Sequence, residues 1–471
     1  MAGALAETAI LLREDFSTNG PINAGIWDIN HWQLNDNPSY IGRTQQKQEL
    51  PKAQNGALQL VLDTFLDGNA FSGSEAITHQ KFAVSSGLAF EFSGRFQTEQ
   101  RGLVAGLFTY AGTNSGHDEI DFEAVTKHPN EIQTNVYANE PLGGGHSQYH
   151  GLSGTIRDWH TYRIEWLPDS VRWLVDGKEV RVEHNVVPTM AMALHLNIWA
   201  PDYKWGGAFE STFNPTKSSS ENQSFRYEVD YVQVSKLSVV QGAGGHETLF
   251  GTAANDAIYG QDGDDVLVGG AGDDLLVGGA GTDVAHYAIA AAAASITRNA
   301  DGSVSVASES HGSDTLRGME LLRFSDQVVL LDKPASLGAD LFDAKHYLAN
   351  NPDVAAAVET IPGFTAAAHY AVFGAREGRD PNVLFDEDWY LAQHTDVAAA
   401  IGRGLLSTGY QHYQAFGWRE DRDPSRWFDT SAYDEVNPGV EVGGIGPLAH
   451  YLTVGMGQGL RIVGVPGADG V

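Results

Sequence analysis

The chain has 471 residues, enough for two or three domains that each bury a hydrophobic core. Its 29 basic and 60 acidic residues give a formal net charge of −31, which excludes nucleic acid and anionic lipid surfaces as natural partners. Cysteine is absent, so disulfides and thiol chemistry are excluded, and outside the cell the fold would depend on packing or on bound metal.

The sequence predicts neither an N-terminal secretory signal nor a membrane span. Residues 1–12 lack a basic segment, and Glu7 interrupts their short apolar stretch. No apolar run approaches the roughly 20 residues that a membrane-spanning helix needs.

Residues 1–238 are predicted to form an antiparallel β-sandwich. Short segments in which apolar and polar residues alternate, such as Ala57–Leu62, His160–Trp166 and Val171–Val175, are separated by turn residues. Asp176-Gly177 after the last of these is a strong hairpin signal. No helical periodicity of useful length interrupts the pattern, which favours two packed sheets.

Three acids recur at every second position in the segment Asp118–Glu123. In a strand, Glu119, Asp121 and Glu123 share one face, and the residues between them enter the opposite face. Such a row can line a solvated sheet face, but ordinary faces interleave Lys, Thr or Ser to limit repulsion. Crowded carboxylates keep one member protonated, which is the division of labour that glycoside hydrolysis requires.

A retaining glycoside hydrolase needs its two carboxyl groups about 5–5.5 Å apart. Residues four apart on a strand have Cα atoms roughly 13 Å apart. A concave sheet and inward-leaning side chains must therefore close the gap between Glu119 and Glu123.

Together with its flanking motifs, this segment resembles glycoside hydrolase family 16, most closely the bacterial lichenases, which are endo-β-1,3-1,4-glucanases. The resemblance covers about residues 12–236 and includes Phe108–Gly112, Gln133–Tyr137, Trp159–Trp166, Trp173–Gly177 and Leu196–Trp199. It implies a concanavalin A-like β-jelly-roll sandwich and a double-displacement mechanism. Glu119 is the implied nucleophile, Glu123 the general acid/base and Asp121 the residue that tunes the pair. The extra residue of laminarinase-type members is missing, which favours β-1,3-1,4-glucan over β-1,3-glucan.

The same resemblance implies a substrate groove in which aromatic rings stack on sugars and polar groups bind hydroxyls. Core packing is an equally good interpretation of any single aromatic residue, and Trp159, Trp166 and Trp173 are predicted to lie in the sandwich core. His117 stands where lichenases have tryptophan, which leaves the preferred substrate open. The implied groove residues, with those close by, are Glu75, Phe108, Tyr110, His117, Asn135, Tyr137, Asn197, Trp199 and Trp205.

The family also carries a calcium ion on the convex face of the sandwich. Gly56 and Asp230 match positions that supply its ligands, although Asp230 is equally compatible with a solvated surface acid.

A strict nine-residue period begins at Gly242. The units GAGGHETLF, GTAANDAIY, GQDGDDVLV, GGAGDDLLV and GGAGTDVAH resemble the calcium-binding nonapeptides of RTX proteins, which stack into a parallel β-roll. Ca²⁺ would lie between turns 18 residues apart, and the closing strands extend the predicted roll over residues 242–335. A solvated acidic linker is the alternative interpretation. The sixth positions, expected to supply carboxylates to calcium, are Glu247, Asp256, Asp265, Asp274 and Asp283.

The RTX resemblance also implies export without an N-terminal signal, through a type I secretion apparatus. The chain is therefore expected to be secreted and extracellular.

Residues 340–465 contain three further repeats of helix-forming composition. Phe342-Asp343, Phe385-Asp386 and Phe428-Asp429 follow one another at intervals of 43 residues. The tyrosines and histidines that recur with them are interpreted as packing residues, because every repeat needs the same interface. No function is assigned to this region.

Two other functions compete with glucan hydrolysis. His117 is compatible with a depolymerase of a bacterial exopolysaccharide, since relatives without the extra residue also cleave such polymers. A non-catalytic glucan-binding or adhesion protein is the alternative of another class, and the intact acids Glu119, Asp121 and Glu123 weigh against it.

Overall fold

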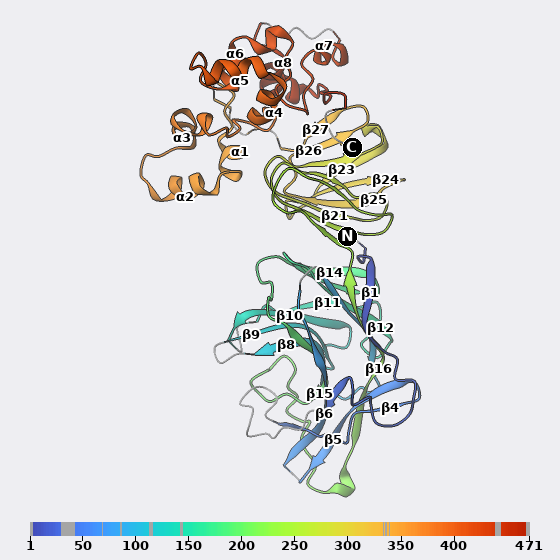
Figure 1. The fold of residues 1–471 in the computed structure, drawn as a ribbon. Coiled ribbons are helices and arrows are strands. Elements are labelled where there is room, and N and C mark those ends of the chain that lie inside the picture. Colours follow the sequence, from blue (N-terminus) through green and yellow to red (C-terminus); the bar gives the residue numbers. More distant parts are fainter. Residues whose placement is uncertain are drawn as a thin grey trace. The chain divides into compact units, whose positions relative to one another are not determined.

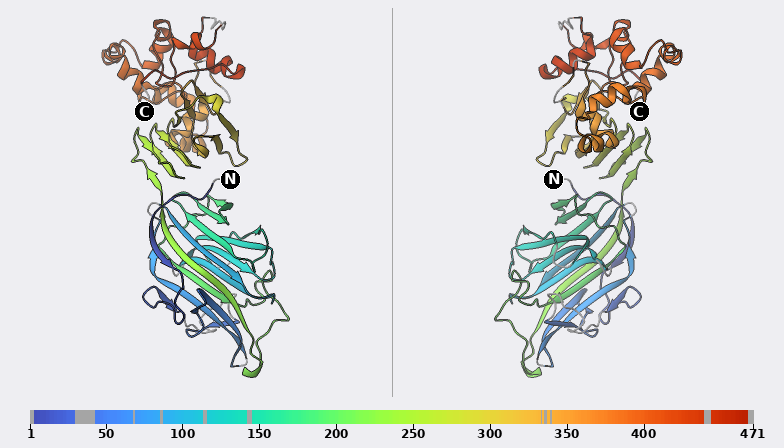
Figure 2. Two further views of the ribbon diagram at one scale, coloured as in Figure 1. Left: turned by 90° about the vertical axis from the view of Figure 1, so that its right-hand side faces the viewer. Right: turned by 90° about the vertical axis from the view of Figure 1, so that its left-hand side faces the viewer.

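The computed structural model describes residues 3–29, 43–67, 69–84, 87–112, 116–141, 145–332, 334, 337–338, 340–438 and 444–467. The chain divides into two compact units, Met1–Ser238 and Val239–Val471. Both units can be followed in Figures 1 and 2. The predicted fold class is confirmed: an antiparallel β-sandwich is followed by a parallel β-roll and then by short helices.

The first unit is a sandwich built almost entirely of antiparallel strands. Hydrogen bonding runs in the order β11-β10-β9-β8-β15-β6-β5-β16-β7-β12-β13-β14, with β1 on β16, β2 and β3 on β6, and β4 on β5. Strand β6 pairs with both β5 and β15 and so joins the two layers. The strands are β1 (Glu7–Glu14), β2 (Trp27–Ile29), β3 (Thr44–Gln46), β4 (Lys52–Gln54), β5 (Ala57–Leu66), β6 (Ala70–Phe82), β7 (Leu88–Phe96), β8 (Val104–Gly112), β9 (His117–Val125), β10 (Glu131–Glu140), β11 (Gln148–Gly151), β12 (His160–Trp166), β13 (Val171–Val175), β14 (Lys178–Glu183), β15 (Met192–Trp199) and β16 (Ser224–Leu237), with the short helix η2 (Ser219–Glu221) before the last.

The alternating apolar residues of both layers meet in one core. Phe92 contacts Phe122 edge to face and Tyr162 at a tilt, with ring centroids 5.9 and 5.7 Å apart. Trp166 and Trp173 are completely buried. The prediction for Trp159 is wrong, because this side chain is 41% exposed. Trp159 has the strand parity of outward-facing Thr161, and the guanidinium of Arg95 covers its ring at 4.6 Å.

The second unit begins with a roll of two parallel sheets. Their order is β17-β19-β21-β25-β24-β23 in one and β18-β20-β22-β26-β27 in the other. Ile258, Leu267 and Leu276, at the eighth position of successive nonapeptides, are buried in the core between the sheets. The elements are β17 (Val239–Gln241), β18 (Thr248–Phe250), β19 (Ala257–Asp262), β20 (Val266–Val268), β21 (Leu275–Ala280), β22 (Val284–Tyr287), η3 (Ala291–Ala293), β23 (Ala294–Arg298), β24 (Val304–Ser308), β25 (Gly312–Arg317), β26 (Leu321–Phe324) and β27 (Val328–Leu330).

Helices complete the second unit, and the Phe-Asp pairs of the repeats explain where they begin. Asp343 and Asp386 accept backbone N–H groups in the first turns of α1 and α4, as helix N-caps do. The tyrosine of each repeat is buried and hydrogen-bonds to the repeat's histidine, as in the 2.9 Å contact between Tyr390 Oη and His412 Nδ1, so these residues pack. The helices are α1 (Ala344–Ala349), α2 (Pro352–Thr360), α3 (Ala366–Val372), η4 (Gly374–Arg376), α4 (Glu387–Gln393), α5 (Thr395–Gly402), α6 (Gly409–Ala415), η5 (Gly417–Glu420), α7 (Ala432–Val436), α8 (Pro447–His450), the π-helical η6 (Tyr451–Gly455) and η7 (Met456–Gln458).

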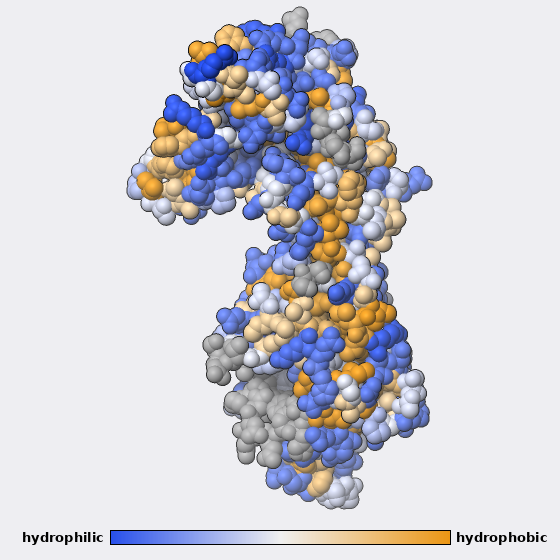
Figure 3. All heavy atoms as spheres, in the orientation of Figure 1, coloured by the Kyte–Doolittle hydropathy of each residue, from blue (hydrophilic) through white to orange (hydrophobic). Residues whose placement is uncertain are grey.

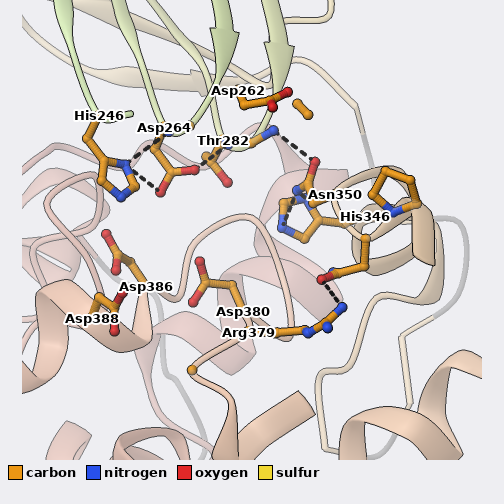
Figure 4. Close-up of a pocket in the computed structure, with 16 residues that line it drawn as sticks. His246, Asp262, Asp264, Thr282, His346, Asn350, Arg379, Asp380, Asp386 and Asp388 are labelled. Carbon is orange, nitrogen blue, oxygen red and sulfur yellow. Dashed lines mark hydrogen bonds and ion pairs between the residues drawn. The ribbon is translucent and has the colours of Figure 1, made fainter. Parts of the chain in front are cut away.

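The helices and the roll share one hydrophobic core, in which Val266 and Val284 of the roll lie with Tyr347 and Phe385 of the helices. Beside this core, one row of roll turns faces the helices across a cavity of about 430 Å³ (Figure 4). The N–H of Gly281 in a turn donates to Oδ1 of Asn350, at the end of α1, over 3.1 Å. The helical repeats therefore pack directly against the turns of the roll.

Within the part of the chain that the structure describes, no helix is long and apolar enough to cross a membrane. On the face seen in Figure 3, hydrophilic residues are spread over both units and hydrophobic residues are scattered among them.

Candidate active site

Strand β9 carries the three acids between β8 and β10. By register, Glu119 lies between Tyr110 and Tyr137. Asp121 lies between Phe108 and Asn135, and Glu123 between Gly106 and Gln133. Alternation places all of these residues on one face of the sheet.

The opposite face of β9 is fixed by the core. Ile120 and Phe122 are completely buried, and the indole N–H of Trp173 donates to the backbone oxygen of Asp121 over 3.0 Å. At the start of the strand, both carboxylate oxygens of Asp118 accept backbone N–H groups, from Asn139 and from Thr189 and Met190, each at 2.7 Å. The acids therefore project from a strand that is held along its length.

Burial and mutual repulsion raise the pKa values of two of the three acids. Burial is the main cause of a pKa of about 8 for Glu123, and the charge of Glu119 adds to it. The pKa of Asp121 is raised well above its usual range, first by burial, then by the charges of Glu119 and Glu123. Near neutral pH, the protonated forms of Glu123 and Asp121 are therefore favoured beside Glu119, which still has 18% of its side chain exposed.

The predicted groove residues lie in register with the acids on the neighbouring strands of the sheet. Asn197 of β15 pairs with both Glu75 of β6 and Gly106 of β8. Its Oδ1 accepts the backbone N–H of Gly106 over 3.1 Å. A Cβ at Gly106 would lie only 2.7 Å from that oxygen. Because residue 106, which pairs with Glu123, is a glycine, the Asn197 amide has room beside it. Glu75 and Asn135 are buried polar residues on the same face.

His117 stands next to the candidate nucleophile. Its Nε2 lies 3.1 Å from Oε2 of Glu119, and only 3% of its side chain is exposed. The imidazole ring packs against Tyr137 and Tyr110, with centroids 4.4 and 5.6 Å apart. The ring therefore lies at the end of the site that contains Glu119, together with the two tyrosines.

The other end of the site is aromatic. Trp199 and Trp205 lie with ring centroids 5.6 Å apart, and Tyr149 packs in the same cluster. Trp199 pairs with Val104, whose other partner Val125 lies two residues beyond Glu123 on β9. The row of carboxylates is thus flanked by His117 with its tyrosines on one side and by two tryptophans on the other.

Two residues of this face were not predicted. The ring of His195 stacks on Phe108 with a centroid distance of 4.9 Å, and its Nδ1 lies 3.2 Å from Oε1 of Glu75. Gln133 is buried directly beside Glu123 in the register. The alternation that singles out Asn197 and Trp199 also includes His195, so the signal was present in the sequence.

The pair predicted for a convex-face calcium lies on neighbouring strands. Gly56 immediately precedes β5, and Asp230 is an exposed residue of β16. Leu58 of β5 pairs with Val229, so the register brings the two positions close together. Calcium binding there remains a prediction.

The sixth-position carboxylates of the roll form a ladder. Oδ1 of Asp265 accepts the N–H of Glu247 over 2.8 Å, and Oδ1 of Asp274 accepts that of Asp256 over 2.9 Å. The N–H of Asp265 in turn donates to Asp283 Oδ1 over 3.0 Å. In the first two units the sixth-position acid accepts an N–H within its own turn, from Ala243 in the case of Glu247 and from Thr252 in the case of Asp256.

These turns have the properties that calcium requires. Asp256, Asp265, Asp274 and Asp283 are completely buried, and one carboxylate oxygen of each has no hydrogen-bond partner. Burial raises the pKa of Asp265 to about 6, of Asp274 to about 7 and of Asp283 to about 9. Among the described residues no three His, Asp or Glu side chains gather closely enough to hold a metal by themselves, so a cation here also needs backbone carbonyls.

Comparisons with known proteins agree with this division. Residues 38–233 match the model of glycosyl hydrolases family 16. Residues 241–276 and 250–285 match the RTX calcium-binding nonapeptide repeat.

Individual relatives match part of the chain. A beta-glucanase of Fibrobacter succinogenes is 28% identical over 223 residues, which are 44% of this chain and 58% of the relative. A beta-glucanase of Bacillus subtilis is 35% identical over 101 residues, 21% of this chain and 41% of the relative. A solved lichenase structure, described as a beta-1,3-1,4-glucanase from a mouse hindgut metagenome, is 24% identical, with a TM-score of 0.40. That match covers 48% of this chain and 99% of the lichenase.

The chain thus covers less than two thirds of the length of the two curated relatives. Residues 38–233 form a domain of glycosyl hydrolases family 16, and RTX calcium-binding nonapeptide repeats follow it.

Proposed function

We propose that the family 16 domain is a retaining endo-β-glucanase that cleaves β-1,3-1,4-glucan or β-1,3-glucan. Glu123 gives its proton to the glycosidic oxygen while Glu119 attacks the anomeric carbon, and the leaving chain departs. Glu123 then takes a proton from water, which displaces Glu119 and restores both groups. The observation that carries this proposal is the placement of Glu119 on one strand face with Glu123, whose pKa is raised to about 8.

Asp121 lies between the two reacting acids and has a positioning role in this mechanism. A hydrogen bond joins its carboxyl group to that of Glu119. Because burial favours the protonated form of Asp121, its proton lies toward Glu119 and limits the repulsion within the row.

The substrate groove follows from the same rows. In this proposal Glu75, Asn135 and Asn197, which share the face of the acids, bind hydroxyl groups, and the aromatic residues at the two ends stack on sugar rings. The Trp199–Trp205 pair is the best stacking platform, since two indoles lie together there.

A second candidate substrate is a bacterial exopolysaccharide. His117 favours it, because an imidazole in contact with Glu119 is smaller and more polar than the indole that lichenases have at this position. A polymer with polar or bulky substituents next to the cleaved bond would fit such a subsite better than an unsubstituted glucan.

Incubation with barley β-glucan, laminarin and a bacterial exopolysaccharide, followed by sizing of the products, tests these alternatives. An endo-β-glucanase gives short oligosaccharides from barley β-glucan or laminarin. Release of repeat units from the exopolysaccharide alone would make the chain a depolymerase. Binding to a glucan without any cleavage would favour the non-catalytic protein and refute the enzyme.

We further propose that the nonapeptide turns bind Ca²⁺ through buried sixth-position carboxylates and backbone carbonyls, and that Gly56 and Asp230 contribute to a calcium site on the sandwich. The repeats also favour export through a type I secretion apparatus to the extracellular space. Expression in a bacterium with and without such an apparatus tests this, since the chain should reach the medium only when the apparatus is present.

A further inference from the structure

The roll continues beyond the repeats that its sequence displays. The nonapeptide match ends at residue 285, and the chain then leaves the roll to form the hairpin of β23 and β24. It returns as β25, which pairs in parallel with β21, and as β26, which pairs in parallel with β22. Two further strands are therefore added to the same parallel sheets, after an insertion that breaks the nine-residue period.

Glu320 takes the place of a sixth-position acid after this insertion. In the repeats, the N–H of Asp256 donates to the carboxylate of Asp274, 18 residues later in the chain. The N–H of Asp283 likewise donates to Oε2 of Glu320 over 2.9 Å, although these residues are 37 apart. The hydrogen-bond ladder thus passes from Asp283 to Glu320 without a change in pattern.

Gly318 takes the place of the glycine that opens each nonapeptide. A Cβ at Gly260 would collide with the carboxylate of Asp265 and with the backbone oxygen of Gly278, which shows that these two oxygens border the same small space. A Cβ at Gly278 would collide in the same way with the carboxylate of Asp283 and with the backbone oxygen of Gly318. Gly318 and Glu320 therefore stand in register with Gly278 and Asp283, although they are two residues apart and not five, so the further turn is shorter than a nonapeptide turn.

One of the two oxygens that border the space at Gly278 is an unpaired, buried carboxylate oxygen. Asp283 is completely buried, and its Oδ2 has no hydrogen-bond partner. An oxygen lone pair of this kind costs free energy unless a donor or a cation meets it. A carbonyl and a carboxylate on either side of the gap are the ligands that Ca²⁺ prefers.

We propose that Asp283, Gly318 and Glu320 form a calcium site beyond the nonapeptide repeats, with Gly318 supplying its carbonyl oxygen. This inference rests on the proposal that the repeats themselves bind calcium. The other row of turns ends differently, because the second oxygen of Asp314 accepts the hydroxyl hydrogen of Tyr287 over 2.9 Å. The extra ion therefore binds in the row of Glu320.

Counting the calcium ions bound by the full chain tests this site. After removal of calcium with a chelator, equilibrium dialysis against calcium gives the number of ions and their affinities for wild type, Glu320→Gln and Glu309→Gln. Glu309 is an exposed acid at the end of the hairpin and serves as the matched control. Glu320→Gln should bind one ion fewer, and Glu309→Gln should match wild type.

Two results would overturn the site in different ways. If Glu320→Gln binds as many ions as wild type with the same affinities, the site beyond the repeats does not exist. If wild type binds no calcium at all, the calcium role of the repeats fails as well.

Amide exchange of residues 316–326 in saturating calcium shows whether Glu320→Gln retains β26. Should that variant fail to fold, Glu320→Asp keeps the charge on a shorter side chain. It should bind the full number of ions with one of them weakened, and unchanged affinities would again overturn the proposal.

Discussion

The raised pKa of Glu123 makes a quantitative prediction about the pH dependence of hydrolysis. With a pKa of about 8, about nine-tenths of this carboxyl group is protonated at pH 7. At the ordinary value of 4.5, only about 0.3% would carry the proton. The environment of β9 thus raises the amount of the acid form about 300-fold. Wild-type kcat/KM should therefore fall as the pH rises through about 8, because the proton donor is lost.

Replacing this side chain by an amide of the same size removes the proton donor alone. Glu123→Gln should lower kcat/KM on barley β-glucan by roughly 10²–10⁴-fold, the usual contribution of general acid–base catalysis. This corresponds to about 2.7–5.5 kcal/mol of transition-state free energy. On an aryl glucoside with a good leaving group, the first step needs no acid, so the variant should form the glycosyl-enzyme and lose the fall near pH 8.

The assay compares initial rates on both substrates from pH 4 to 10 for wild type, Glu123→Gln and the control Glu221→Gln. Glu221 is exposed in η2 and should leave the pH profile unchanged. If Glu123→Gln hydrolyses β-glucan at the wild-type rate, or keeps the fall near pH 8 on the aryl substrate, Glu123 is not the acid.

Replacement of the nucleophile should abolish hydrolysis, and azide should restore turnover of an aryl glycoside by Glu119→Gly with inverted product; an azide product of retained configuration, identified by NMR, would contradict the role of Glu119. Asp121→Asn should lower kcat/KM by less than the roughly 10²–10⁴-fold expected for Glu123→Gln, since it removes no reacting group, and steady-state rates on β-glucan decide this. In a chelator, β19–β22 should lose amide protection in the full chain while β9 keeps it, which hydrogen exchange followed by mass spectrometry measures; full protection of the roll would refute calcium-dependent folding. The calcium-free chain should lose stability as the pH rises from about 4 to about 7. Burial raises the pKa of Asp274 to about 7, so the folded chain binds this proton more tightly than the unfolded chain does. Urea unfolding of the roll in chelator at pH 4.5 and 7.5 tests the direction of this change.

Much of the candidate site could be predicted because a strand has a period of two. The alternation in Asp118–Glu123 is enough to place three acids on one face and two apolar residues in the core. His195 lies in an equally regular segment, but it stands one residue before the motif Leu196–Trp199, so the resemblance does not include it. The alternating strands predict Trp159 in the core together with Trp166 and Trp173, but its parity points outward and it is exposed.

The continuation of the roll could not be found from periodicity. Within the repeats, partners are 18 residues apart, whereas Asp283 and Glu320 are separated by 37. The hairpin between them shifts the period, and Glu320 replaces the aspartate of the earlier units. Only the pairing of β22 with β26 brings these residues together, so this contact belongs to the tertiary structure.

Burial of carboxylates has opposite consequences in the two units. On β9, desolvation is compensated by a proton, which makes Glu123 useful as an acid. Between Gly242 and His286, eight acids stand with no Lys or Arg, and at neutral pH protons compensate only those whose pKa burial raises to about 7 or above, Asp274 and Asp283. A divalent cation compensates them at neutral pH, and folding of the roll then depends on the calcium concentration around the chain. If the repeats bind calcium as proposed, the roll stays unfolded where calcium is scarce and folds where it is abundant. The hydrophobic core of the sandwich is built from apolar side chains, so its packing does not depend on these acids.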